Sequence, residues 1–188
     1  MKKTLLLAGV ASLFAVNAAN AMEIKPYVGL DYNYSTLTTA HNYEYNREFD
    51  RYFNNGSVVA GAKLMNNFGL EAYYQRSLNN TKHFVEGEKV TSRIQSYGVD
   101  ALGYLPLGCE QKVELIAGLG IGEYELKARE KAYDDSSKET GIGYRMSAGA
   151  QYNIDNNWAV RGMFRHVVVE GSDLDRVNEY SAGVRYSF

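Results

Sequence analysis

The side chains that could do chemistry fall into two groups, and the larger group follows a period of two. Charged residues recur at every second position within apolar stretches, so each stretch has a polar face and an apolar face. We assign eleven of them to one common interior: Lys25, Asp31, Lys63, Glu71, Asp100, Glu114, Arg145, Arg161, Arg165, Glu179 and Arg185. Five acids against six bases is close to balance, which favours mutual ion pairing over a conduit of one sign.

The second group consists of histidines and acids that lie outside these alternating faces. They are His41, His83, His166, Asp134, Asp135, Asp173 and Asp175. A hydrolase at the surface would need a nucleophile beside a base, and no spacing of that kind stands out. Asp173 and Asp175 near Glu170 form a weak cation motif, because surface acids are usually just solvated. We therefore expect no enzyme activity, no metal and no cofactor.

Gly118, Gly120 and Gly122 have the spacing G-x-G-x-G, which could suggest a nucleotide-binding loop. Such a loop opens a helix, whereas this sequence continues with the alternation of a strand. All three glycines belong to the polar face. We expect them to leave room for long arginine and lysine side chains inside the fold.

The last ten residues show which kind of element positions the charges. Tyr180, Ala182, Val184, Tyr186 and Phe188 form one face of the stretch 179–188, and polar residues form the other. This alternation predicts a strand. An exposed strand edge with an aromatic face would promote aggregation in water. In a closed barrel surrounded by lipid the same pattern is required.

Seven earlier stretches alternate in the same way, at about 24–34, 57–64, 70–75, 93–105, 113–122, 142–152 and 158–165. The connections after the second, fourth and sixth stretches are short and the others are long. An even strand count with this asymmetry is typical of outer-membrane barrels. The sequence therefore predicts an all-β, eight-stranded, antiparallel, up-and-down transmembrane barrel. Short turns and both mature termini would face the periplasm, and long loops the outside.

Aromatic residues at the ends of the apolar faces are expected to form two girdles in the membrane interfaces. The periplasmic girdle would contain Tyr152, Trp158, Tyr186 and Phe188, and the outer girdle Tyr32, Tyr34, Tyr74, Tyr144 and Tyr180.

The N-terminus predicts export. Lys2 and Lys3 precede an apolar run at 5–16, and Ala19 and Ala21 form a small-x-small cleavage pattern. Residues 1–21 are thus expected to be a cleaved signal peptide and residues 22–188 a single barrel domain. Removing two of the 20 basic residues leaves 18 against 22 acids, a net charge of −4, which argues against nucleic-acid binding. Cys109 is the only cysteine, so no intramolecular disulfide can form.

Three motifs carry a family resemblance: Gly-Leu-Gly-Ile-Gly at 118–122, the stretch 143–152 with its turn into Trp158, and the terminal Tyr-Ser-Phe. They resemble the eight-stranded OmpA-type transmembrane barrel family, which includes OmpX. The resemblance implies that the outer-membrane assembly machinery reads Tyr180, Ala182, Val184, Tyr186 and Phe188. It does not imply cell-wall anchoring, because the periplasmic peptidoglycan-binding domain of OmpA is lacking.

Eight strands leave a lumen only wide enough for side chains. Turns centred on Asn67 and near Asp155 would place Lys63 opposite Glu71 and Arg145 opposite Arg165. Because two guanidinium groups repel, we expect Glu179 or Asp31 between the arginines. A narrow pore for small solutes remains the alternative.

The first long connection contains aromatic residues and arginines, a composition typical of contact surfaces. The candidate contact residues are Tyr43, Tyr45, Arg47, Phe49, Arg51, Tyr52 and Phe53. Alternatively, the first two strands simply extend beyond the membrane as a twisted ribbon. Basic residues near the outer rim could pair with lipopolysaccharide phosphates: Arg47, Arg51, Lys82, Arg93, Lys127 and Arg129.

These features favour a monomeric scaffold in the bacterial outer membrane, with surface loops that bind a host or surface component. The resemblance suggests adhesion or envelope integrity. A narrow pore and a hydrolase at the barrel rim are the competing hypotheses.

Overall fold

The computed structural model describes residues 24–39, 52–65, 67–77, 80–83, 89–108, 110, 112–130, 136–171 and 174–188. Side chains are described for these residues except 38–39, 80–83, 89–92, 126–130, 136–139 and 174–175. The predicted signal peptide, Ala19 and Ala21 included, and Cys109 lie outside the described residues.

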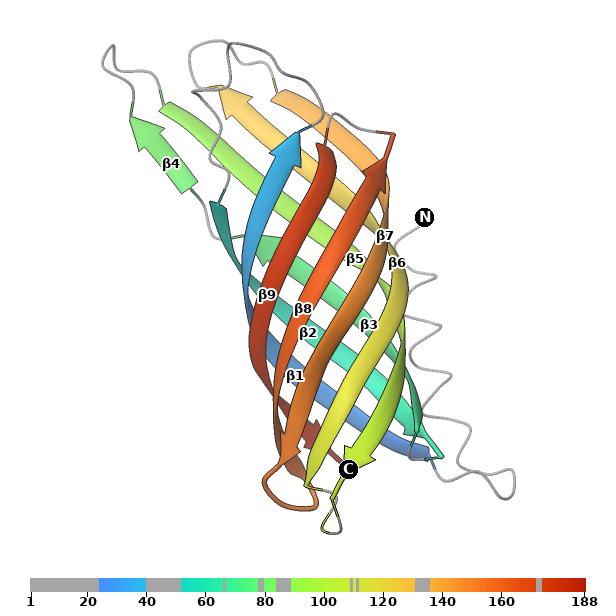
Figure 1. The fold of residues 1–188 in the computed structure, drawn as a ribbon. Helices are drawn as coiled ribbons and strands as arrows, with labels where there is room; N and C mark the ends of the chain where they lie inside the picture. Colours follow the sequence, from blue (N-terminus) through green and yellow to red (C-terminus); the bar gives the residue numbers. More distant parts are fainter. Residues whose placement is uncertain are drawn as a thin grey trace.

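All regular structure in this part of the chain is β-structure (Figure 1). The strands are β1 (Ile24–Thr39), β2 (Tyr52–Leu64), β3 (Phe68–Ser77), β4 (Asn80–His83), β5 (Lys89–Leu107), β6 (Val113–Glu130), β7 (Ser136–Asn153), β8 (Trp158–Glu170) and β9 (Leu174–Ser187). Among the described residues, no helix is long and apolar enough to cross a membrane.

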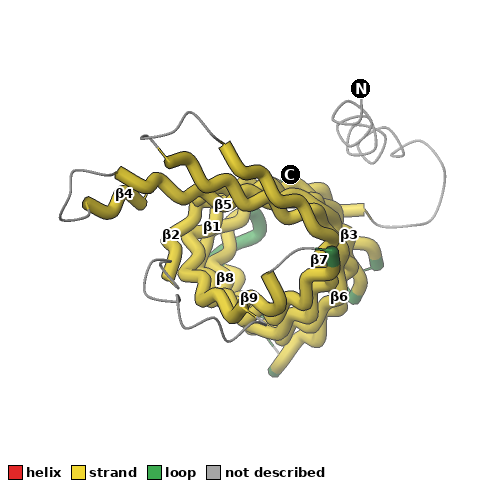
Figure 2. The backbone as a smooth tube through the Cα atoms, turned by 90° about the horizontal axis from the view of Figure 1, so that it is seen from above, coloured by secondary structure: helices red, strands yellow, loops and turns green. Residues whose placement is uncertain are grey.

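The nine strands occupy eight positions around a closed antiparallel barrel (Figure 2). Both β3 and β4 pair with β5, and the register shifts between the pairs Arg76–Gln95 and Asn80–Ser92, so β4 continues β3 after an irregularity. The ring closes because β3 pairs with β2 and β5, and β9 pairs with β8 and β1. The predicted eight-stranded barrel is confirmed.

The strands run further than the alternation suggested. The stretch expected at 113–122 continues to Glu130, and the stretch expected from 57 begins at Tyr52. Apolar alternation marks only the part of a strand that faces lipid. Backbone pairing continues beyond it, as in the pair Arg129–Ser136 of β6 and β7. The expected ribbon-like extension of the first two strands is therefore present up to Thr39 and from Tyr52.

Burial follows the alternation, with the apolar side chains outside and the charged ones inside. Leu30 is 59% exposed, whereas the neighbouring Asp31 is 6% exposed. Arg161 is buried between the exposed Val160 and the lipid-facing Gly162. A soluble protein would place these residues the other way round. The faces are those that the alternation predicted.

Three short connections lie at one end of the barrel, which we call the turn end, and the opposite end is the loop end (Figure 1). The C-terminus is fixed at the turn end, because the Ser187 N–H donates to the Asn157 carbonyl over 2.7 Å and the Phe188 N–H to the Pro26 carbonyl over 3.1 Å. In the turn between β7 and β8, the Asp155 carboxylate accepts N–H groups of Asn157 and Trp158. These bonds favour the ionised form and lower the pKa of Asp155.

The two cross-turn pairs expected from the sequence are wrong. Lys63 lies opposite Gly69, because Met65 adopts a left-handed conformation with φ of 49° and closes a tighter turn. Arg165 lies opposite Ser147 rather than Arg145, because the bonds to Asp155 extend the turn as far as Trp158. Each register differs by two residues from the expected one. A shift of two keeps every side chain on its face.

The expected role of the glycines on β6 is wrong in one respect. Side chains from other strands do pack against Gly118, Gly120 and Gly122, but they are not arginines or lysines. A methyl group added at these positions would meet, in order, Leu102, Asp100 and Tyr73. The glycines therefore let inward side chains of β3 and β5 lie flat on the β6 backbone.

Two glycines on β5 provide a matched test of this packing. A Cβ at the inward-facing Gly98 would fall on the Ile121 carbonyl oxygen and 2.6 Å from Gly122 Cα, and backbone cannot yield cheaply. Gly98→Ala should lower the free energy of unfolding by about 1–3 kcal/mol. Urea titration in lipid vesicles, followed by the fluorescence of the single tryptophan, measures this.

Gly103→Ala is the control, because the nearest atom to a new Cβ there is the Ala117 carbonyl oxygen at 3.8 Å. Its effect should stay within about 0.5 kcal/mol. Equal losses for both variants would contradict the packing argument.

Candidate functional site

Eight ionisable side chains meet in the middle of the lumen, from six strands of the barrel. We call them the ion network, and they comprise four acids and four arginines: Asp31, Glu71, Asp100, Glu179, Arg145, Arg161, Arg165 and Arg185. All are buried, with at most 6% of any side chain exposed. Isolated charges would be strongly destabilising at such positions, so the contacts between them decide whether the barrel is stable.

Glu71 on β3 forms a bidentate contact across the lumen. Its two carboxylate oxygens accept from Nη1 and Nη2 of Arg161 on β8, each over 2.8 Å. The Tyr27 hydroxyl donates to the same carboxylate over 2.9 Å, and Arg185 Nε lies 3.7 Å away. Two parallel bonds between a planar guanidinium and a carboxylate are among the strongest polar contacts in proteins.

Asp31 on β1 joins three arginines. Arg185 donates to both of its oxygens, over 2.6 and 2.9 Å. Nη2 of Arg165 and Nη2 of Arg161 lie 3.4 and 3.6 Å from Asp31 Oδ2. Asp31 therefore links the contacts of β8 to those of β9.

Glu179 on β9 links the network toward the loop end. It accepts from Arg165 over 3.1 Å, from Gln75 over 2.6 Å and from the Ser35 hydroxyl over 3.1 Å. Arg145 Nη2 lies 3.8 Å away. One acid thus contacts both arginines that were expected to face each other across the turn.

Arg145 is held differently from the other three arginines. Its guanidinium carbon lies 3.7 Å from the centre of the Tyr73 ring, a cation–π contact. Asp100 Oδ2 is 3.6 Å away, too far for a hydrogen bond. Arg145 thus combines the Tyr73 ring with two carboxylates, Asp100 and Glu179, that both lie beyond hydrogen-bond distance.

The remaining three predicted interior charges lie nearer the turn end, outside the ion network. Lys63 pairs with Glu114 over 2.5 Å rather than with Glu71, which binds Arg161. Lys25 is exposed. Charged residues are only part of the interior. The sequence analysis did not name the uncharged polar residues that face inward beside them, although their alternating positions place them on the same face. These are Tyr27, Asn33, Ser35, Tyr73, Gln75 and Ser181.

The histidines and acids considered for catalysis are not brought together in the described part of the chain. His166 lies on the outward face of β8, and its Nδ1 is 2.6 Å from the amide oxygen of Asn178. Among the described residues, no three potential metal ligands form a group. The other candidates lie outside the described residues, or only their backbone is described: His41, His83, Asp134, Asp135, Asp173 and Asp175.

Two residues of the predicted contact loop are described, and they point in opposite directions. Tyr52 is exposed and stacks on Tyr34 with ring centres 5.9 Å apart. Phe53 is 2% exposed and lies inside the barrel, so it is not available to a ligand at the surface. The other residues of that prediction lie outside the described part: Tyr43, Tyr45, Arg47, Phe49 and Arg51.

The predicted C-terminal motif lies on the outward face of β9. Tyr180, Val184 and Phe188 are exposed, as is Ala182 between them. The Tyr186 ring lies between those of Trp158 and Phe188, with centres 5.1 and 5.2 Å apart and edge-to-face geometry. Three of the four residues of the predicted periplasmic girdle thus form one aromatic cluster at the turn end.

Comparison with known proteins identifies the family to which this barrel belongs. The family model of the outer membrane protein beta-barrel domain matches residues 5–188. Protein opa of Haemophilus influenzae is 30% identical over 101 residues, which is 52% of this chain and 82% of that protein.

Two solved structures are similar over most of the chain. Neisserial surface protein A has a TM-score of 0.64 at 16% identity, over 90% of this chain and all (100%) of that one. Ail, the attachment invasion locus protein of Yersinia pestis, in complex with the heparin analogue sucrose octasulfate, has a TM-score of 0.62 at 16% identity, over 88% of this chain and 99% of that one. At these identities the structures show a shared fold.

Removing one charge from the ion network tests its contribution to stability. Glu71→Gln leaves Arg161 without its bidentate partner in a buried site, and should lower the free energy of unfolding by about 3–5 kcal/mol. Urea titration in lipid vesicles measures the loss.

Glu110→Gln is the matched control, since the Lys112–Glu110 pair is exposed at 2.9 Å. Its effect should be below about 1 kcal/mol. A loss for Glu71→Gln no larger than that of the control would show that the network does not stabilise the barrel.

Proposed function

Because the chain belongs to the outer membrane protein β-barrel domain family, we propose that its barrel is a closed, monomeric scaffold in the bacterial outer membrane that presents surface loops for adhesion or envelope integrity. The ion network carries this proposal. Paired side chains occupy the middle of the lumen, so the loop end is the part of the molecule that is offered to a partner.

The proposed orientation places the turn end in the periplasm and the loop end outside the cell. Short connections at one end and longer ones at the other support it, since bacterial outer-membrane barrels share this asymmetry. In this orientation residues 1–21 act as the signal peptide, and both mature termini remain periplasmic. Basic residues at the outer rim would then face lipopolysaccharide phosphates.

The proposed assembly signal is the outward face of β9, with Tyr180, Ala182, Val184, Tyr186 and Phe188 read by the outer-membrane assembly machinery. Two observations support this proposal. The five side chains share one face of β9, and Tyr186 and Phe188 at its end form an aromatic cluster with Trp158. That face is available to another protein before the barrel meets lipid.

The proposed ligand is a component of a host, a matrix or a neighbouring surface. The structure of Ail, the attachment invasion locus protein of Yersinia pestis, holds a heparin analogue, which makes a sulfated glycan the first probe to test. The first loop supports this choice, because Arg47 and Arg51 can pair with sulfate groups.

Two other functions compete with this one. A narrow pore would need a continuous path through the lumen, and a rim hydrolase would need a nucleophile beside a base. We propose neither, because the network acids are engaged with arginines and the His166 ring with Asn178.

Shortening the first loop tests the adhesive role. Replacing residues 40–51 by a short Gly-Ser linker should reduce binding of cells that display the protein to immobilised heparin by about tenfold, since each lost charged contact costs roughly 1.4 kcal/mol or more. The same replacement at residues 131–135 is the control and should retain binding. Unchanged binding after removal of 40–51 would refute the role of this loop.

Single-channel recording in planar bilayers tests the competing pore. The purified protein should give no steady conductance, because the ion network leaves no open path between β1, β3, β8 and β9. A stable single-channel current would favour the pore over the scaffold.

A further inference from the structure

The two ends of the lumen are built from different chemistry. Toward the turn end, polar and charged side chains surround a cavity, beside a buried apolar cluster of Leu102, Tyr104, Ile116 and Met163. Toward the loop end, a second apolar cluster lies on β6, β8 and β9.

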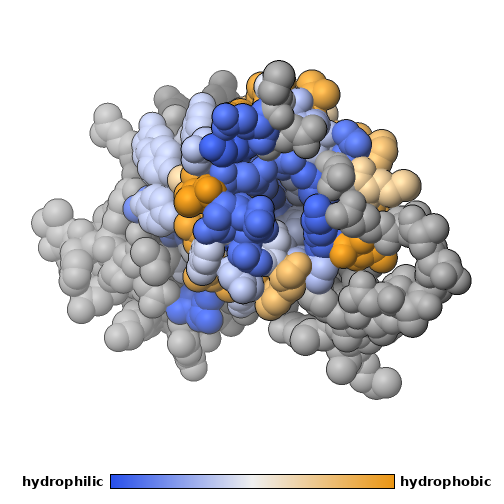
Figure 3. Space-filling model, turned by 90° about the horizontal axis from the view of Figure 1, so that it is seen from below, coloured by the Kyte–Doolittle hydropathy of each residue, from blue (hydrophilic) through white to orange (hydrophobic). Residues whose placement is uncertain are grey.

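The turn-end cavity has a volume of about 410 Å³. The turn between β7 and β8 contributes residues 153–158, and Lys25, Lys63, Lys112, Glu110, Glu114 and Gln151 complete the polar wall. Figure 3 shows hydrophilic side chains gathered at the centre of this end. A polar cavity of this size has room for about a dozen water molecules, at roughly 30 Å³ each.

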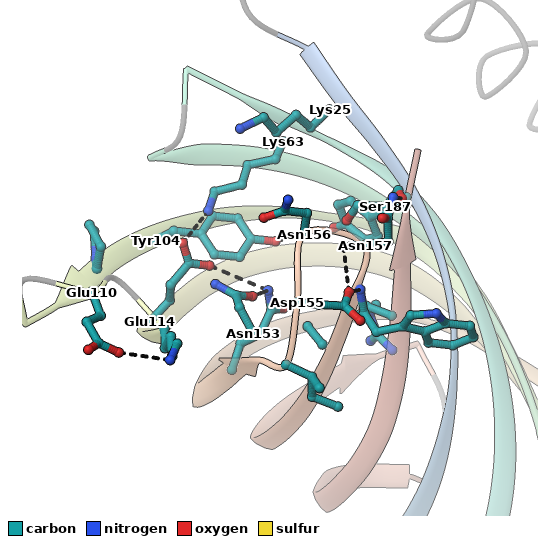
Figure 4. Close-up of a pocket in the computed structure, with 18 residues that line it drawn as sticks. Lys25, Lys63, Tyr104, Glu110, Glu114, Asn153, Asp155, Asn156, Asn157 and Ser187 are labelled. Carbon is teal, nitrogen blue, oxygen red and sulfur yellow. Dashed lines mark hydrogen bonds and ion pairs between the residues drawn. The ribbon is translucent and has the colours of Figure 1, made fainter.

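Side-chain contacts hold several of the polar residues against the wall of the cavity. Lys63 extends over the Tyr104 ring, 4.6 Å from its centre, to reach Glu114 (Figure 4). The Gln151 amide donates to Asn153 over 2.9 Å and also approaches Glu114 at 3.5 Å. These contacts join β2 and β7 to Glu114 on β6, along the wall of the cavity.

The inner end of the cavity reaches the ion network at Arg185. Arg185 lines the cavity and donates to Asp31, and Tyr27 lines the cavity and donates to Glu71. The Nε atoms of Arg161, Arg165 and Arg185 are buried without a hydrogen-bond partner in the described structure. Such donors normally bind ordered water.

Toward the loop end, an apolar layer lies on β1, β6, β8 and β9. Leu37 on β1, Val177 on β9 and Val167 on β8 are direct neighbours across the sheet and face inward. The Tyr124 ring completes the layer by crossing the backbone at Gly143 to reach Val167. Val167 is 0% exposed.

We propose that the lumen is a blind aqueous vestibule: water and small hydrophilic solutes enter it from the turn end as far as Arg185, and the apolar layer of Leu37, Tyr124, Val167 and Val177 seals it at the loop end. The ion network then exchanges solvent through the vestibule alone. This property is independent of any ligand of the surface loops.

Cysteine accessibility in detergent micelles tests the proposal, because both ends of the barrel then face the same aqueous reagent. On a Cys109→Ser background, Gln151→Cys reports the vestibule and Val177→Cys the apolar layer. A small charged thiol reagent should modify Gln151→Cys at least about tenfold faster, since buried thiols are inert. Val184→Cys, which faces the detergent, is the matched slow control.

Reaction rates in urea normalise the intrinsic reactivity of each thiol, and circular dichroism shows which variants fold. Val169→Cys replaces Val177→Cys if that variant does not fold. Protection of Gln151→Cys, or modification of the apolar layer as fast as Gln151→Cys, would overturn the proposal.

A second cysteine measurement tests whether the apolar layer is the barrier to solvent. Asn33→Cys lies between the apolar layer and the ion network, where Asn33 is fully buried and hydrogen-bonded to Ser57. Its modification should be slow, and should become about tenfold faster when Val167→Ser and Val177→Ser replace part of the layer, because smaller polar side chains leave room for water and hydrogen-bond to it. An unchanged rate would mean that the seal lies elsewhere.

Discussion

The structure depends on one constraint, which is that lipid cannot hydrogen-bond to the chain. Every backbone N–H and C=O inside the membrane must find a partner within the protein, and a sheet achieves this only by closing on itself. Closure through the pairs of β9 with β1 and β3 with β5 removes both sheet edges. The polar face must then turn inward, because the outward face meets hydrocarbon.

The inward face brings charges into a narrow space, and their pairing follows from that. Four acids and four arginines neutralise one another in the ion network, whereas Lys63 and Lys25 lie nearer the turn end. Arginine suits the middle because its planar guanidinium can bind several carboxylates at once, as Arg161 does with Glu71 and Asp31. Lysine is strongly hydrated and suits a wall that faces a polar cavity.

The two ends of the barrel lumen are packed differently. The turn end holds the C-terminus and a cavity with polar and charged side chains, while an apolar cluster that includes Val167 and Val177 lies toward the loop end. A scaffold that is sealed beneath its loops can vary those loops without opening a path across the membrane.

The sequence by itself determined the closed barrel, the strand faces and which charges point inward, because these follow from a period of two and from the direction of lipid. It did not determine which charges meet. Glu71 binds Arg161, 90 residues away, across a lumen that exists only after closure. The cross-turn pairs shifted by two residues because the conformation of Met65 and the bonds to Asp155 set the register. Partners thus depend on turn geometry and on barrel closure, which only the tertiary structure decides.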